Sequence, residues 1–324
     1  MVKNNKINIA EIRKFFFKKN IQVNSIKKFN SDASNKEFTL FDTTHEKYLA
    51  LSFRNQPKDF NRYINATNAL HALKIPVPAV IHSNRKTVTI LMHYLPSDNA
   101  TKYLNTKYLT TILQTACDHL IKIRKSKLKL SNIPKKPNDS LRKSAIWGVS
   151  LYVEHYKKKI DGHDFILNLL IKNLKNTFKK LSKYKAILTH GDFFLDNFIF
   201  YDDEVWIIDH QDLVYDHPQL DIASLIYDAR RIYSKKIIDK TLNSYFKDIK
   251  ASQKQNMIDS IHLVSLARNL RVLGAWVYLN QKGKKNYLKS FKKTTWYQIN
   301  THLDHLKLYE LKDLLGIIYK ETIS

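Results

Sequence analysis

Three polar residues, Asp192, Asn197 and Asp209, have the types and spacing that could build a metal site beside a general base. Two short apolar segments, 198–201 and 205–208, are joined by a polar turn and predict an antiparallel hairpin. Because the outer ends of a hairpin meet, we expect Asn197 and Asp209 to lie side by side. Amide and carboxylate oxygens are hard ligands that suit Mg²⁺ rather than Zn²⁺. Asp192, on the loop just before the hairpin, is then placed to accept a hydroxyl proton.

The spacing within this group matches the pattern of phosphoryl transfer. The protein-kinase loop has a base Asp, an Asn five positions later and a separate metal-binding Asp, and Asp192 and Asn197 have the same separation. With the His-Gly-Asp start at 190–192, the chain resembles the aminoglycoside phosphotransferase and choline kinase superfamily of small-molecule kinases. The alternative is a surface hairpin with chance acids. The combined presence of His-Gly-Asp, Asn at this offset, an apolar hairpin and Ile-Asp favours the kinase interpretation.

Longer stretches resemble one branch of that superfamily, the anomeric N-acetylmuramate and N-acetylglucosamine kinases of bacterial cell-wall recycling. Ile-Ile-Asp-His-Gln-Asp at 207–212 and Ser-Leu-Ile-Tyr-Asp-Ala-Arg at 224–230 are typical of it. The turn at 31–36 resembles the branch's N-terminal Gly-Asp-Ala-Ser turn, and 267–274 resembles its Arg-Asn-x-Lys-x-Leu-Gly region. The resemblance covers nearly the whole chain and is densest from 186 to 290.

The elements that must position these residues form two parts along the chain. Residues 1–95 predict a small β-rich N-lobe, with helices at 7–19 and 58–73 and strands at 23–29, 37–42, 47–53, 79–82 and 87–94. Residues 96–324 predict a large helical C-lobe, with helices at 106–125, 138–160, 163–183, 218–232, 235–249, 253–281 and 284–306. The catalytic hairpin interrupts these helices. We therefore expect an α+β chain, and the resemblance implies a two-lobe protein-kinase-like fold with nucleotide on the N-lobe and acceptor and metal on the C-lobe.

Glycine usage limits how the chain can bind a nucleotide. None of the six glycines precedes Gly148, which excludes a Walker A loop and a Rossmann fingerprint from the first 147 residues. Within the expected third strand at 47–53, the stretch Tyr48 to Phe53 also lacks the Lys that small-molecule kinases usually carry late in this strand, and Lys47 and Arg54 only flank it. The small polar turn between the first two strands offers Ser31 and Ser34, whose N–H groups could form a phosphate nest. Lys36 beside it is either a phosphate contact or a solvated hairpin lysine.

Further residues around the catalytic loop have expected roles. His190 is expected to brace the loop through hydrogen bonds, and Asp221 to tie the loop to the next helix or to cap that helix. Gln211 and Asp212 follow the metal-site turn, where they would meet the hydroxyls of an acceptor. Arg230 either pairs with acids of the helices or binds a substrate carboxylate. The same two alternatives apply to the other arginines that stand out in this part of the chain, Arg231, Arg268 and Arg271.

The amino-acid composition limits the kinds of partner and the cellular compartment that we expect for the protein. The net charge of +26 comes from 55 basic residues, of which only ten are Arg, and the lysines are dispersed, so a dedicated nucleic-acid partner is not expected. No apolar stretch approaches the roughly 18–20 residues of a membrane span. The single Cys117 permits no intrachain disulfide, which agrees with a reducing compartment. We expect a cytoplasmic monomer without a membrane partner.

The predicted activity is that of a kinase dependent on ATP and Mg²⁺. Asp192 is the expected base, and Asn197 and Asp209 the expected metal ligands. The resemblance implies an amino sugar as acceptor, phosphorylated at the anomeric hydroxyl of N-acetylmuramate or N-acetylglucosamine. An aminoglycoside, choline or another small alcohol is the alternative acceptor. A noncatalytic kinase-like protein that binds nucleotide is the alternative from another class.

Overall fold

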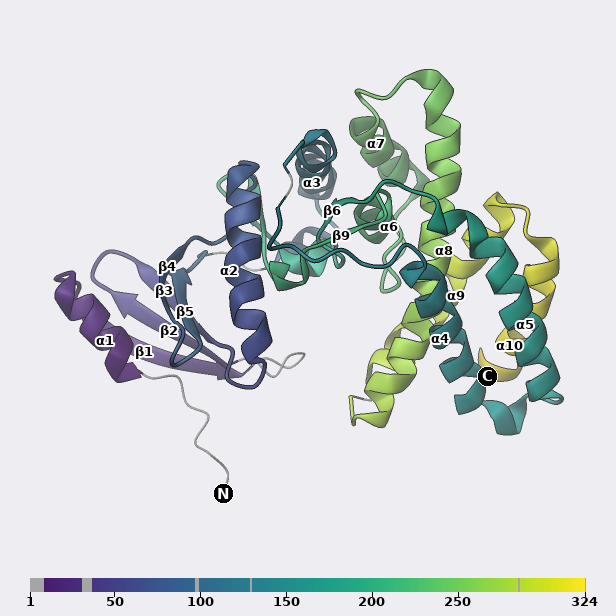
Figure 1. The fold of residues 1–324 in the computed structure, drawn as a ribbon, viewed down its shortest axis with the longest axis horizontal. Coiled ribbons are helices and arrows are strands. Elements are labelled where there is room, and N and C mark those ends of the chain that lie inside the picture. Colours follow the sequence, from purple (N-terminus) through teal and green to yellow (C-terminus); the bar gives the residue numbers. More distant parts are fainter. Residues whose placement is uncertain (1–8, 31–36, 97–98, 129, 285, 324) are drawn as a thin grey trace. The chain divides into compact units, whose positions relative to one another are not determined.

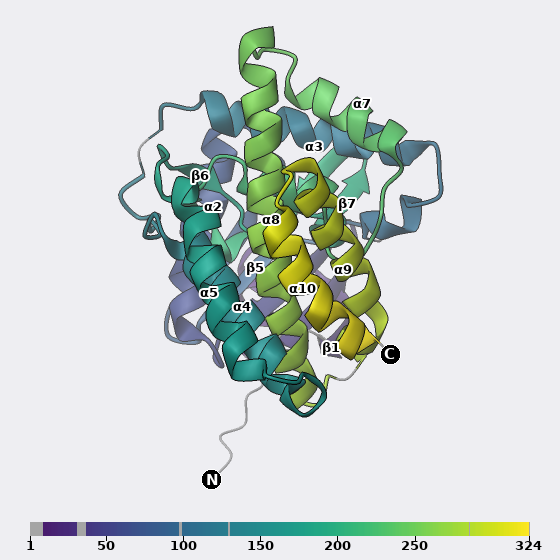
Figure 2. The same cartoon turned by 90° about the vertical axis from the view of Figure 1, so that its right-hand side faces the viewer.

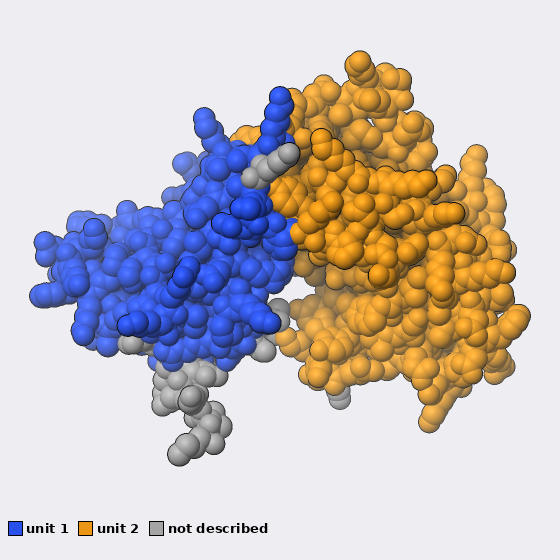
Figure 3. Space-filling model, in the orientation of Figure 1, with its two compact units in different colours: residues 1–115, 126–134, 195–213 blue, residues 116–125, 135–194, 214–324 orange. Residues whose placement is uncertain are grey.

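The computed structural model describes residues 9–30, 37–96, 99–128, 130–284 and 286–323. Two compact units make up the chain (Figure 3). The first contains residues 1–115, 126–134 and 195–213, and the second contains 116–125, 135–194 and 214–324. The antiparallel sheet of the N-terminal region and the helices that follow confirm the expected α+β class. The predicted hairpin at 198–208 belongs to the first unit. The division of the chain at residue 95 into an N-lobe and a C-lobe stays a prediction.

A five-stranded antiparallel sheet forms the centre of the first unit, in the order β1-β2-β3-β5-β4. Its strands lie within a few residues of the expected ranges: β1 (Val23–Asn30), β2 (Glu37–Thr43), β3 (Lys47–Ser52), β4 (Val80–Asn84) and β5 (Thr89–His93). Helices α1 (Ile9–Lys18) and α2 (Pro57–Ala72) lie on opposite faces of this sheet (Figure 1).

The alternation of side chains along β3 explains why both faces are covered. Ala50 packs in one cluster with Ile12 and Phe16 of α1. The next residue, Leu51, points the other way and packs with Phe60 and Tyr63 of α2. Because successive residues of a strand face opposite sides, an apolar run such as Leu49–Leu51 requires a partner on each side. The two helices supply those partners.

The predicted hairpin is present in the first unit. Strands β7 (Phe198–Tyr201) and β8 (Glu204–Ile207) pair antiparallel, with Phe198 opposite Ile207. Asp202 and Asp203 between them have φ of +54° and +56°. Two consecutive left-handed residues are typical of the two-residue turn whose twist matches a hairpin, and Asp tolerates this conformation better than most residues.

The second unit is built around one long helix. Helix α8 (Ala251–Gln281) runs between α4 (Ser140–His155) and α9 (Asn286–His305) (Figure 2). Four further helices are α5 (His163–Thr177), α6 (Leu220–Ile226), α7 (Lys235–Tyr245) and α10 (Tyr309–Ile323). Helix α3 (Tyr108–Lys125) begins in the first unit and ends in the second. In the part of the chain that the structure describes, no helix is both long and apolar enough to cross a membrane.

Two glycines let α4 and α8 pack backbone against backbone. A Cβ built on Gly274 would lie 2.5 Å from Cα of Gly148, and one built on Gly148 would lie 2.3 Å from the carbonyl oxygen of Leu270. Both distances are far below ordinary van der Waals contact, so no side chain fits at either position. This crossing fixes the stretch of α8 that carries Arg268 and Arg271.

Three features of the second unit differ from the sequence expectation. The helix expected at 218–232 ends at Ile226, because the carboxylate of Asp228 accepts the backbone N–H of Arg230 at 3.2 Å and so competes with helical pairing. Strands β6 (Ile187–Thr189) and β9 (Val214–Asp216) were not expected, because three residues give too short a pattern. Helix α10 was not expected either, although its buried residues recur at helical spacing: Leu311, Leu315 and Ile318.

Candidate functional site

The loop at 190–192, which the sequence predicts to be catalytic, belongs to the second unit and is held by the side chain of Asp221. This carboxylate, in the first turn of α6, accepts the backbone N–H of His190 at 2.6 Å and that of Gly191 at 2.9 Å. Gly191 has a φ of +88°, a left-handed conformation that side chains rarely adopt. Burial raises the pKa of Asp221, although His190 and the two N–H groups act in the opposite direction. The loop therefore keeps its shape through one buried acceptor that receives two donors.

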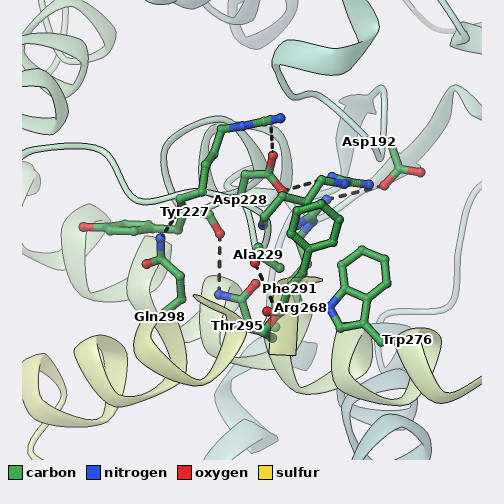
Figure 4. Close-up of polar contacts among 12 residues, drawn as sticks. Asp192, Tyr227, Asp228, Ala229, Arg268, Trp276, Phe291, Thr295 and Gln298 are labelled. Atoms are coloured by element: carbon green, nitrogen blue, oxygen red, sulfur yellow. Dashed lines mark hydrogen bonds and ion pairs between the residues drawn. The ribbon is translucent and has the colours of Figure 1, made fainter. Parts of the chain in front are cut away.

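Asp192 projects from this loop towards Arg268 of α8 (Figure 4), and Arg271 of the same helix also lies near it. Its Oδ1 lies 3.5 Å from Nη2 of Arg268 and 4.0 Å from Nη2 of Arg271. Half of the Asp192 side chain is exposed. Partial withdrawal from water would raise the pKa of Asp192, but Arg268, Arg271 and the other nearby cations outweigh it and hold this pKa below its ordinary value. Asp192 is thus ionised at neutral pH and open to solvent on one side.

A second carboxylate, Asp228, pairs with two arginines that follow it in the sequence. Its side chain is fully buried and pairs with Arg230 at 3.0 Å and with Arg231. The guanidinium of Arg230 also lies over the ring of Phe194, 4.2 Å from its centroid. We call the four residues Arg230, Arg231, Arg268 and Arg271 the arginine cluster.

The predicted metal ligands lie together in the first unit. The N–H of Ile208 donates to the carbonyl of Asn197 at 3.0 Å, which holds the backbone at Asn197 beside the peptide that precedes Asp209. Asp209 has a φ of +59° and leads into the short 3₁₀ turn at His210–Asp212. The amide of Gln211 donates to Oδ1 of Asp209 at 3.1 Å. The hairpin thus brings the two residues to the same end, as its sequence predicted.

Helix α2 supports the turn after Asp209 through contacts that the sequence did not reveal. His210 is fully buried, and its Nε2 lies 2.7 Å from the hydroxyl of Thr67. Its ring lies against that of Tyr63, with the centroids 4.4 Å apart. Burial, and then the charge of Asp209, raise the pKa of Tyr63. Since Thr67 and His210 are 143 positions apart, local patterns carry no sign of this pair.

The donor set at Asn197 and Asp209 fits Mg²⁺. One amide oxygen and one carboxylate are hard donors, and Mg²⁺ in nucleotide sites takes only one or two protein ligands beside water and phosphate oxygens. Across the described ranges no group of three or more His, Cys, Asp or Glu side chains could hold a metal ion, so a closed zinc-type site is absent from that part of the chain. Asn197 and Asp209 as ligands stay a prediction.

The structure describes some, but not all, of the residues expected to contact the acceptor or the nucleotide. Gln211 is buried and engaged with Asp209, whereas Asp212 is largely exposed and pairs with Arg62 at 2.9 Å. The role of these residues and of Arg230 in acceptor binding stays a prediction. The three residues expected to hold the nucleotide phosphates, Ser31, Ser34 and Lys36, lie outside the described residues.

Comparisons with known proteins give a family and a fold. Residues 25–253 match the profile of the phosphotransferase enzyme family, called APH. No match is found among curated protein sequences. The solved structures that resemble the chain include choline kinase LicA from Streptococcus pneumoniae, with 15% identity over 94% of this chain and 100% of that one and a TM-score of 0.60.

Two further solved structures have the same fold. Spectinomycin phosphotransferase APH(9)-Ia, in complex with ADP and spectinomycin, is 12% identical over 91% of this chain and 94% of that one, with a TM-score of 0.61. Amicoumacin kinase hAmiN, in complex with AMP-PNP, Ca²⁺ and Ami, is 12% identical over 93% of this chain and 95% of that one, with a TM-score of 0.58. The expected kinase-like fold is therefore confirmed.

Proposed function

Since this chain belongs to the phosphotransferase enzyme family, we propose that it transfers the γ-phosphoryl group of ATP to a hydroxyl group of a small molecule, with Mg²⁺ as cofactor. The observation that carries the proposal is that the β7–β8 hairpin brings Asn197 and Asp209 to one end, five and seventeen positions after Asp192, which lies on a loop fixed by Asp221. The nucleotide and divalent cation in the solved complexes of this fold support ATP and Mg²⁺.

In the proposed reaction Asp192 orients the acceptor hydroxyl and receives its proton. Its pKa lies below the ordinary value of an Asp, so the carboxylate is a weak base, which suits a loose transition state in which positioning contributes more than base strength. Asp221 keeps Asp192 in place by fixing the peptides before it. Asn197 and Asp209 would hold Mg²⁺, which when bound neutralises charge on the nucleotide phosphates.

For the acceptor we propose an amino sugar phosphorylated at its anomeric hydroxyl, N-acetylmuramate or N-acetylglucosamine. The sequence runs at 207–212 and 224–230 support this choice over choline and the aminoglycosides. The arginine cluster beside Asp192 also supports it, because a cationic acceptor would be repelled there. A cytoplasmic location and a monomeric state complete the proposal as predictions.

The test is phosphate transfer from ATP to a panel of N-acetylmuramate, N-acetylglucosamine, choline and several aminoglycosides, with the product position read by phosphorus NMR. Asp192→Asn should lower kcat by about 10³-fold or more while ATP binding by calorimetry is unchanged. Asp203→Asn, the same change at an exposed hairpin turn, should leave turnover as it is.

Two results would contradict the proposal. Turnover above a tenth of wild type in Asp192→Asn would remove this residue from its role. Nucleotide binding without turnover across the panel would favour the noncatalytic alternative.

A further inference from the structure

We infer that the acceptor carries a negatively charged group, a carboxylate or a phosphate, and that Arg268 and Arg271 of α8 bind this group next to Asp192. The inference rests on the proposed function, because it specifies the acceptor of that same site. It distinguishes between the two proposed sugars: N-acetylmuramate has a lactyl carboxylate, whereas N-acetylglucosamine has no charge.

The first observation is an excess of positive charge. Four guanidinium groups of the arginine cluster face two carboxylates, Asp192 and Asp228. Asp228 pairs directly with Arg230 and Arg231. Arg268 and Arg271 are left to share a single oxygen of Asp192, at 3.5 and 4.0 Å, well beyond the roughly 2.7–2.9 Å of a charge-assisted hydrogen bond. Among the residues that the structure describes, the α8 side of the cluster thus has two guanidinium groups at one carboxylate oxygen.

The second observation is the state of Arg268. Only 4% of its side chain is exposed. Its Nε and Nη1 have no hydrogen-bond partner among the residues that the structure describes. Burial lowers the pKa of Arg268, with the charges of Asp192 and Asp228 acting in the opposite direction. A guanidinium has five N–H donors, and leaving them unmatched in a buried position is costly. An anion that accepts from these nitrogens would remove that cost.

The third observation is access. Arg271 is 40% exposed and Asp192 is 50% exposed, so the side of the cluster on which they lie is open to solvent. Aromatic rings hold the buried part in position. The ring of Phe194 lies under Arg230 and Arg268, with centroid distances of 4.2 and 5.6 Å, and Trp276 also contacts Arg230. The guanidinium groups are thus held ready for a ligand that arrives from the Asp192 side.

The nucleotide is the other possible source of an anion. Both arginines contact Asp192, the residue proposed to meet the acceptor hydroxyl, and all three belong to the second unit. We therefore assign the arginines to the acceptor and let the experiment distinguish the two sources.

The experiment compares two acceptors that differ only in charge, N-acetylmuramate and its carboxamide, on three proteins. These are wild type, Arg271→Gln and Arg85→Gln, the last being the same change at an exposed turn of the first unit. Arg271 is chosen over Arg268 because its side chain is partly exposed, which makes the variant more tolerable to the fold. KM for each acceptor and for ATP is measured, and binding of N-acetylmuramate without ATP is measured by calorimetry.

We expect wild type and Arg85→Gln to prefer the acid to the amide. In Arg271→Gln the KM for the acid should rise by about tenfold to a hundredfold, with little change for the amide and for ATP. Arg271→Lys should recover part of the loss, because it restores the charge but not the planar fork.

Three outcomes would overturn the inference. One is equal use of acid and amide by wild type. Another is a KM for ATP that rises in Arg271→Gln while the acceptor KM stays, which would assign the arginines to the nucleotide. The third is unchanged binding of N-acetylmuramate in the variant. Binding that depends on Arg271 without turnover in wild type would instead support the anion site and contradict the proposed function, so the two can fail separately.

Discussion

The crossing of α4 and α8 leads to a prediction whose size follows from the structure. In Gly274→Ala the new Cβ would lie 2.5 Å from Cα and 2.6 Å from the carbonyl oxygen of Gly148. These are backbone atoms, which cannot rotate away, so the two helices must separate by about 1 Å to reach ordinary contact. Overpacking of this kind costs up to about 3 kcal/mol, and the higher helix propensity of Ala offsets about 1 kcal/mol. We expect a net loss of about 2 kcal/mol.

Urea unfolding of the whole protein measures this loss, and the chain contains a matched control. Gly316 lies within α10, and a Cβ built there meets nothing within 4 Å. Gly316→Ala should therefore stabilise the protein by about 0.5–1 kcal/mol, since only the propensity change remains. If Gly274→Ala proved as stable as Gly316→Ala, the close backbone contact between α4 and α8 would be refuted.

Three other variants test single contacts. Asp221→Asn keeps one acceptor oxygen and loses the charge that fixes the catalytic loop, so kcat should fall about tenfold with the KM for ATP unchanged; a fall in ATP affinity alone would contradict this. His302 is fully buried, and burial holds its pKa well below the ordinary value. Below pH 6.5 this histidine therefore binds a proton in the unfolded chain but not in the folded chain. Stability should fall as pH falls, by about 1.4 kcal/mol at pH 5.5 for this group, and unfolding of His302→Gln at pH 7.5 and 5.5 should show a correspondingly smaller difference. Thr67→Val leaves Nε2 of His210 without its hydroxyl partner and should cost about 1–3 kcal/mol in urea unfolding, whereas Thr67→Ser should cost little; equal losses would mean that packing rather than the hydrogen bond supports the turn.

The parts of the fold that the sequence predicted are those with a local pattern. The β7–β8 hairpin could be predicted because two apolar segments flank a turn of acidic residues, and α2 because its apolar residues recur at helical spacing. The spacing of Asp192, Asn197 and Asp209 identified the candidate site for the same reason.

Contacts between distant segments could not be predicted. Arg268 meets Asp192 across 76 positions, and no pattern near either residue indicates the other. Because Arg is scarce in this Lys-rich chain, Arg268 did stand out in the sequence: a planar guanidinium can bind a carboxylate through two hydrogen bonds, which a Lys ammonium cannot do in the same way. The sequence did not indicate which residue Arg268 contacts. Strands β6 and β9 have three residues each, and their pairing depends on the tertiary fold rather than on alternation.

The first unit is built from segments that lie far apart in the sequence, and this affects the order in which its parts are completed during synthesis. Residues 195–213 belong to this unit, and His210 covers the surface of α2 at Tyr63 and Thr67. A ribosome that has finished the N-terminal sheet must add more than a hundred residues before His210 exists, which takes roughly 6–24 s at about 5–20 residues per second. During that interval Thr67 and the ring of Tyr63 lack their contact with His210, although the sheet already covers Phe60 and the rest of the apolar side of α2. The lobe that is first in the sequence is therefore not the first to be completed.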